Sequence, residues 1–161
     1  MKKVCEILSG PPGAGKSTEC EGLKKVYGND AIVCPDTIRE MMGCIELDAN
    51  GSPVRILQDC NPEVFKVYYA IVEQRMKHGA PVVCDATHTS AKGLKELRRL
   101  CEKYGYKAVL HRIECPLETL LLRNTQRGYK NVPADVVRRM YDSFIHFEFE
   151  DWYELQVHKN G

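Results

Sequence analysis

The feature that most constrains this chain is a bend rich in glycine and proline, which lies between an apolar run and a helix-forming segment. The apolar run is Val4–Leu8, and the bend from Gly10 to Gly15 leads directly into Lys16. Glycine lets backbone N–H groups converge on a ligand without an intervening Cβ atom, and proline stiffens the bend. A helix that starts directly after such a bend presents unpaired N–H groups, which favour bound anions.

The bend matches G-x-x-x-x-G-K-S/T, a pattern whose backbone holds the phosphates of a nucleoside triphosphate. In this pattern Lys16 reaches the β- and γ-phosphates, and the Ser17 hydroxyl coordinates Mg²⁺. A glycine-rich turn without a ligand is the alternative, and the complete match between a strand and a helix argues against it. The residues expected to bind nucleotide are Gly10, Pro11, Pro12, Gly13, Ala14, Gly15, Lys16, Ser17 and Thr18.

Strand-like and helix-like segments alternate along the rest of the chain. Apolar runs predict strands at 4–8, 31–34, 81–84, 107–114 and 152–157. Capping and stop signals predict helices at 16–27, 61–77, 91–104, 116–127 and 133–147, and a short helix with Asp36 as its N-cap. This alternation predicts an α/β fold in which helices flank a central parallel sheet. No linker or shift in composition divides the chain, so we expect a single domain over 1–161.

Composition and cysteine spacing exclude several classes of protein. With 43% hydrophobic and 28% charged residues, the chain has a globular rather than a disordered composition. Its net charge of +1 gives no global attraction to nucleic acid or to an acidic membrane. Its eight cysteines never form a C-x-x-C pair, so we expect free thiols, no structural metal and a cytoplasmic location. We expect neither a signal peptide nor a membrane-spanning segment.

Asp36 and Arg39 follow the second predicted strand. In an open parallel sheet, ligands bind beyond the carboxyl ends of the strands, so Asp36 is expected beside the phosphate loop. A carboxylate there can accept the proton of an attacking hydroxyl, and Arg39 can hold an acceptor phosphate. The alternative is a helix cap with an ion pair between positions i and i+3.

Further candidate residues follow the third predicted strand and lie in the last part of the predicted helix 116–127. Asp85 is expected to hold the water shell of Mg²⁺, with Thr87 or His88 beside it. Arg123 and Arg127 lie in a basic segment, which predicts a mobile lid over the triphosphate. A solvated helix end, where basic residues favour the helix dipole, is the alternative for these arginines.

Together these motifs resemble the kinase domain of the bacteriophage polynucleotide 5′-kinases. The closest stretch is Arg123-Asn124-x-x-Arg127-Gly128, followed by Val132-Pro133-x-Asp135-Val136-x-Arg138-x-Met140-Tyr141. The similarity extends over nearly the whole chain, except for 45–59. It implies a kinase-type P-loop NTPase fold with an arginine-bearing lid.

The resemblance also implies a role for each matching residue. Lys16 and Ser17 would be the triphosphate and metal residues, and Asp36 the general base. Arg39 would hold the acceptor phosphate, and Asp85 would be an essential strand-end carboxylate that also serves the metal. Arg127 would contact the donor phosphates, and Arg123 would lie near the adenosine.

The implied reaction is transfer of the γ-phosphate of ATP, with Mg²⁺, to the 5′-hydroxyl of a DNA or RNA end. No membrane partner is expected. The phage enzymes continue into a phosphatase domain with a D-x-D-x-T motif, which this sequence lacks, so no 3′-phosphatase activity is expected. One alternative is a P-loop kinase that acts on a metabolite or antibiotic hydroxyl. Another is a nucleotide-binding module without catalysis, and the intact Asp36 argues against it.

The segment 44–57 falls in the part of the chain that the resemblance does not cover. Asn50-Gly51 predicts a tight turn, and the alternating flanks predict a small hairpin. The hairpin follows Asp36 and Arg39, so it could form a wall at the acceptor side, with Arg55 against backbone phosphate. A peripheral hairpin without substrate contact is the alternative.

Overall fold

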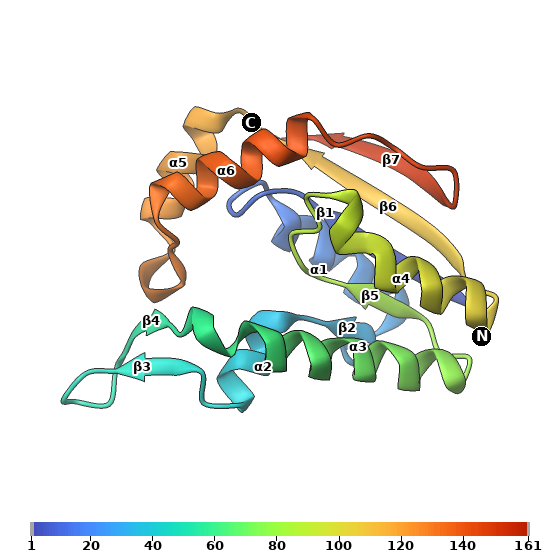
Figure 1. Cartoon of the computed structure of the whole chain (residues 1–161), viewed down its shortest axis with the longest axis horizontal. Coiled ribbons are helices and arrows are strands. Elements are labelled where there is room, and N and C mark those ends of the chain that lie inside the picture. Colours follow the sequence, from blue (N-terminus) through green and yellow to red (C-terminus); the bar gives the residue numbers. More distant parts are fainter. Residues whose placement is uncertain (1, 161) are drawn as a thin grey trace.

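A five-stranded parallel sheet forms the centre of the computed structural model, which describes residues 2–160 (Figure 1). The strand order is β2-β5-β1-β6-β7, and all neighbouring strands are parallel. The strands are β1 (Val4–Ser9), β2 (Ile32–Val33), β5 (Val82–Cys84), β6 (Lys107–Glu114) and β7 (Tyr153–Lys159). The predicted α/β class with a central parallel sheet is confirmed.

The described α-helices are α1 (Lys16–Tyr27), α2 (Pro35–Met41), α3 (Asn61–Lys77), α4 (Ala91–Tyr104), α5 (Leu117–Thr125) and α6 (Ala134–Ile145). Short 3₁₀ turns form at η1 (Asn29–Ala31), η2 (Gln58–Cys60) and η3 (Gly128–Lys130). The ends of α4 follow from its sequence. The Ser90 hydroxyl accepts the Gly93 N–H at the N-terminus, and Gly105 ends the helix in the left-handed region at φ 70°.

Strand β1 divides the interior into two cores. Ile7 faces α3 and α4, where it belongs to the same buried cluster as Tyr68 and Leu97. Leu8 faces the opposite side of the sheet and packs in a second cluster with Leu23 of α1. Successive side chains of a strand point to opposite faces, so one apolar strand contributes to both layers. In Figure 1, α3 and α4 lie in front of the sheet and α1 lies behind it.

Three helices start at a residue other than the predicted one, and proline explains each case. Helices α5 and α6 also end two residues earlier than predicted, at Thr125 and Ile145. Helix α2 begins at Pro35 with Cys34 as its N-cap, so the prediction that Asp36 caps this helix is wrong. Proline supplies a helical φ one residue earlier and places Asp36 inside the first turn. Pro116 and Pro133 act as N-caps with ψ of 144° and 142°, so α5 and α6 each begin one residue later than predicted.

Strands β3 (Ile45–Leu47) and β4 (Pro53–Ile56) pair antiparallel as a hairpin outside the main sheet. Its connection is longer than the expected tight turn at Asn50-Gly51. The Asp48 carboxylate accepts the backbone N–H groups of Asn50 and Ser52, and Gly51 alone adopts positive φ, at 79°. This side chain organises the loop locally, which removes the need for a two-residue turn. Within 2–160, no helix combines the length and apolar character needed to cross a membrane.

Candidate active site

One cavity of about 600 Å³ contains every side chain predicted to take part in catalysis. Its wall combines the start of α1, the start of α2, the segment after β5 and the segment after α5. The predicted residues that line it are Lys16, Ser17, Asp36, Arg39, Asp85, Arg123 and Arg127, together with Pro12, Gly13, Gly15 and Thr18 of the loop. Gly10, Pro11 and Ala14 of the loop are buried and are not among its lining residues.

The glycine-rich loop has the backbone shape that the motif requires. Gly13 and Gly15 have φ of 86° and 107°, a region that is strained for residues with a Cβ atom. A Cβ at Gly15 would lie 1.7 Å from Nδ2 of Asn160, so this approach needs glycine. The Lys16 ammonium donates to the Gly10 and Pro11 carbonyls at 2.8 and 2.9 Å, which holds it across the loop. The loop therefore fits a triphosphate.

Lys16 and Asp85 influence each other's charge inside the cavity. Burial lowers the pKa of the Lys16 ammonium to about 8, although the Asp85 carboxylate opposes the shift, and the Arg127 guanidinium adds to it. Burial likewise raises the pKa of the Asp85 carboxyl, and the positive charge of Lys16 opposes that shift. Both charges lose hydration in the cavity. A bound phosphate would stabilise the Lys16 ammonium, and a cation that accompanies the phosphate would stabilise the Asp85 carboxylate.

Asp36 and Arg39 face each other on the first turns of α2. Arg39 Nη1 donates to Asp36 Oδ1 at 2.8 Å, and its Nε and Nη2 donate to Asn61 Oδ1 at 3.1 and 2.8 Å. The ion pair of the alternative interpretation is therefore present, but the helix cap is not. Sequence reasoning missed Asn61, because an asparagine before Pro62 signals a helix start and says nothing of a distant arginine.

The arginines expected in the lid occupy two different positions. Arg123, on the last turn of α5, donates from Nη1 to the Gly13 carbonyl at 3.0 Å and so contacts the phosphate loop directly. The Arg127 guanidinium lines the cavity and makes no side-chain hydrogen bond within the described residues. The next residues contact α2, where the Tyr129 hydroxyl donates to Glu40 at 2.9 Å and Lys130 pairs with the same carboxylate at 3.3 Å.

The two residues after β5 that were expected to assist Asp85 lie in different environments. Thr87 lines the cavity, and its carbonyl accepts the Gly10 N–H at 2.8 Å. His88 is buried away from the cavity, so it does not assist Asp85. Its Nδ1 lies 2.7 Å from the Leu8 carbonyl and its Nε2 lies 3.3 Å from the Tyr68 hydroxyl. Burial lowers the pKa of His88 to about 4, so the ring is neutral at physiological pH.

Asn160 is a cavity residue without any local sequence signal. Its backbone N–H donates to the Glu114 carbonyl at 2.7 Å, and its Nδ2 donates to the Ala14 carbonyl at 3.0 Å. It thus joins the segment after β7 to the phosphate loop. Phe65, Ile56 and Gln58 line the cavity as well and were not predicted.

Residues 7–146 match the family AAA_33, described as an AAA domain, and no curated protein matches the sequence. A chain of the Pnkp1/Rnl/Hen1 RNA repair complex aligns with a TM-score of 0.74 and 22% identity over 93% of this chain and 48% of that one. A chain of the AvrRxo1-ORF1:-ORF2 complex with ATP aligns with a TM-score of 0.68 and 19% identity over 89% and 47%. A sugar kinase from Janibacter sp. HTCC2649 aligns with a TM-score of 0.66 and 15% identity over 98% and 85%.

At these identities the structural similarity concerns the fold alone. The chain spans about half the length of the RNA repair chain and of the AvrRxo1-ORF1:-ORF2 chain. The family match is different, because it covers most of the sequence, including the glycine-rich loop, Arg123 and Arg127. The chain therefore belongs to the AAA domain family AAA_33, with a P-loop fold of the kinase type.

Proposed function

We propose that this chain is an ATP-dependent kinase that phosphorylates the 5′-hydroxyl of a nucleic acid. The observation that carries the proposal is the Asp36–Arg39 pair, which lines the same cavity as Lys16 of the phosphate loop. A protein that only bound nucleotide would have no need for a carboxylate and a phosphate-binding arginine opposite the loop. A kinase needs both, one for the hydroxyl proton and one for the acceptor.

In the proposed reaction, Asp36 accepts the proton of the 5′-hydroxyl while the oxygen forms a bond to the γ-phosphorus of ATP. The bond from that phosphorus to the bridging oxygen breaks, and ADP leaves with the electron pair. Lys16 and Arg127 stabilise the charge on the phosphates, and Arg39 holds the phosphate next to the attacked sugar. Ser17 and Asp85 would hold Mg²⁺, which neutralises phosphate charge when it is bound.

A nucleic-acid acceptor is supported by the residues around Arg39. Phe65 offers an aromatic surface on which a base can stack, and Ile56 adds apolar contact. Asn61 accepts hydrogen bonds from two nitrogens of the Arg39 guanidinium and so fixes this cation in the cavity, and a fixed guanidinium suits an acceptor that carries a phosphate better than a neutral sugar. The resemblance to phage polynucleotide kinases and the RNA repair chain with the same fold agree with this choice.

A metabolite kinase is the second candidate, because the fold is shared with a sugar kinase. The test is incubation with labelled ATP and four acceptors: a 5′-hydroxyl oligonucleotide, a nucleoside 3′-monophosphate, an unphosphorylated nucleoside and a panel of sugars and aminoglycosides. We expect phosphorylation of the first two, poor use of the nucleoside and none of the panel, with Asp36→Asn as the inactive control. Activity on the panel without activity on the oligonucleotide would establish the second candidate instead.

A further inference from the structure

A second group of polar side chains lies away from the cavity, on the face of the sheet that α1 covers. It is a diagonal row across three strands: Glu6 on β1, His111 on β6 and His158 on β7. Glu6 is level with Val109, two residues before His111, and His111 is level with Gln156, two residues before His158. Steps of two residues keep side chains on one face, so the row points toward α1, which contributes Glu19.

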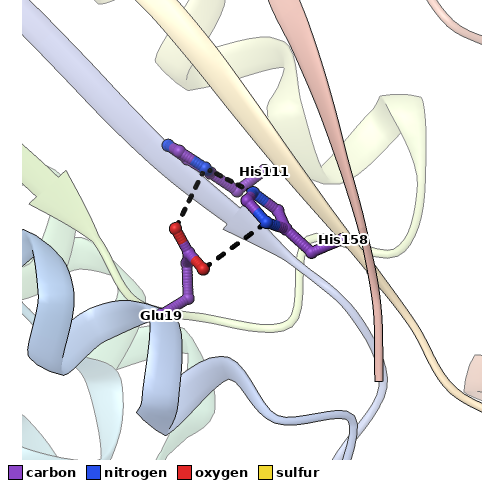
Figure 2. Close-up of side chains that lie close together, drawn as sticks. All are labelled: Glu19, His111 and His158. Atoms are coloured by element: carbon purple, nitrogen blue, oxygen red, sulfur yellow. Dashed lines mark hydrogen bonds and ion pairs between the residues drawn. The ribbon is translucent and has the colours of Figure 1, made fainter. Parts of the chain in front are cut away.

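Three of these side chains converge on one point, as Figure 2 shows. His111 Nδ1 lies 3.1 Å from His158 Nε2 and 3.6 Å from one carboxylate oxygen of Glu19. His158 Nδ1 lies 3.6 Å from the other oxygen of Glu19. One donor atom from each residue can be chosen such that all three lie within 4.8 Å of one another. Two imidazoles and one carboxylate at such spacing form a set of donors for a divalent transition metal.

Glu6 fixes the orientation of the buried histidine. Its carboxylate lies 2.6 Å from His111 Nε2 and also accepts the Tyr27 hydroxyl at 2.9 Å. His111 therefore donates its Nε2 proton to Glu6, and its Nδ1 lone pair is directed at the centre of the group. A carboxylate that orients the far nitrogen of a histidine is the usual outer partner of a metal-binding imidazole.

The atoms of this group that face one another can all donate an electron pair to a cation. With its Nε2 proton donated to Glu6, His111 presents the Nδ1 lone pair to His158 Nε2 and to the Glu19 carboxylate. A cation held between these atoms would be attracted to all three residues. Glu19 and His158 have side-chain exposures of 29% and 34%, so an ion can reach the group from solvent.

We propose that Glu19, His111 and His158 bind a divalent transition metal ion such as Zn²⁺, with a fourth position open to water. This site is distinct from the predicted Mg²⁺ site, which contains only oxygen donors, and it departs from the sequence-based expectation of no structural metal. The ion would join α1 to β6 and β7. Asn160 follows β7 and contacts Ala14 of the phosphate loop, which leads into α1. A bound ion that joins α1 to β7 would therefore hold the elements on both sides of this contact together.

The site can be tested with metal-free protein in the absence of nucleotide, by equilibrium dialysis against Zn²⁺ and by the visible absorption of added Co²⁺. We expect one ion per chain, a tetrahedral or five-coordinate Co²⁺ spectrum and no thiolate-to-Co²⁺ charge transfer. The last criterion matters because the chain has eight free cysteines. Loss of an outer partner of a metal ligand typically weakens metal binding about 10- to 100-fold. Glu19→Gln and His158→Gln each remove a direct ligand, so each should weaken Zn²⁺ binding by at least that factor.

His146→Gln is the matched control, because His146 is an exposed histidine on another helix end and should bind metal no differently from the parent. Saturating Zn²⁺ at about 100 times its dissociation constant should raise the Tm of the parent and of this control by roughly 5–10 °C. The rise should be at most about half as large in Glu19→Gln, whose weaker site is less saturated at the same Zn²⁺ concentration and whose partly exposed side chain can be replaced without disturbing the core. A thiolate spectrum, or equal Zn²⁺ affinity in the parent and in both ligand variants, would overturn the proposal.

Discussion

Arg39 holds the Asp36 carboxylate through a charged hydrogen bond of 2.8 Å between Nη1 and Oδ1. The pair spans one turn of α2, and the Arg39 side chain is the less exposed partner, at 12% against 32% for Asp36. The arginine is fixed from its other edge by Asn61, so the carboxylate meets a preorganised cation rather than a mobile one. Asp36 is thereby held at the wall of the cavity that also contains Lys16, where the proposed general base would act.

Replacement of Asp36 by asparagine should separate catalysis from stability. The amide of Asp36→Asn cannot accept a proton, so kcat should fall by about 100- to 10,000-fold while ATP affinity is unchanged. Loss of one partly exposed i,i+3 pair should change the free energy of unfolding by no more than about 0.5 kcal/mol. Steady-state kinetics and chemical denaturation measure the two effects. A variant that turns over normally but unfolds more easily would identify Asp36 as a structural residue.

The lowered pKa of Lys16 predicts that ATP binding takes up a proton in alkaline solution. In the free protein Lys16 titrates at about 8, so at pH 9 about 0.9 of the chains carry a neutral amine, and at pH 6.5 almost none do. The phosphates favour the ammonium form, so ATP should bind with uptake of nearly one proton at pH 9 and with little uptake through Lys16 at pH 6.5. Calorimetry in buffers of different ionisation enthalpy measures this uptake.

Two substitutions of Lys16 test its charge, the first through proton uptake and the second through turnover. Lys16→Arg carries a charge that does not titrate, so any ATP binding that it retains should proceed without alkaline uptake. Lys16→Ala should abolish turnover, because it removes the cation from the β- and γ-phosphates. Full activity of Lys16→Ala would contradict the assignment of the loop as the donor site.

Asn61 is expected to act as a positioning residue for Arg39. Asn61→Ala frees two of the guanidinium nitrogens, and the resulting misplacement should lower kcat/KM for the acceptor by about 10- to 100-fold, with KM for ATP unchanged. Asn61→Asp keeps an oxygen acceptor at this position and should restore most of the activity. Gln58→Ala removes the hydrogen bond from Asn61 Nδ2 and one polar side chain of the cavity wall but leaves both contacts of Asn61 with Arg39, so it serves as the comparison. Equal losses in Gln58→Ala and Asn61→Ala would point to general loosening of this segment.

His88 should make stability depend on pH in the acidic range. Its pKa is about 4 in the folded chain and about 6.5 when unfolded, so the unfolded chain binds the proton first as pH falls. The stability that the neutral ring contributes is fully present above pH 6.5 and is lost as pH falls toward 4, by up to about 3 kcal/mol. In urea denaturation, His88→Asn should be less stable at pH 7 and should show a shallower slope between pH 6.5 and 4. Asparagine suits this position because His88 has φ 41°. An unchanged slope would show that His88 does not control acid stability.

The hairpin offers a test of how the acceptor end is selected. Ile56 of β4 lines the cavity, and Arg55 pairs across the hairpin with Glu46. Replacement of 48–52 by a two-residue Asn-Gly turn should change the ratio of kcat/KM for recessed and single-stranded 5′ ends, because Ile56 of the hairpin lines the cavity that also contains Arg39. ATP affinity should be unaffected. A ratio equal to that of the parent would identify the hairpin as peripheral.

The sequence by itself determined the parts of this protein that depend on neighbours along the chain. A glycine-rich loop between a strand and a helix specifies its own backbone shape, and Asp36 and Arg39 are joined by the period of one helix. The alternation of apolar runs was sufficient for the α/β class. The boundaries at Pro35, Pro116 and Pro133 were predicted less well, because proline is compatible with both the cap and the first turn of a helix.

Only the tertiary structure decided which distant residues meet. The contacts of Arg39 with Asn61 and of Asn160 with Ala14 join segments whose separation in sequence carries no local signal. His111 and His158 come together because β6 and β7 are adjacent and in a particular register, and a shift of one residue would turn either ring to the opposite face. Strand order and register depend on the packing of the whole chain, so the side-chain groups that they create cannot be read from any one segment.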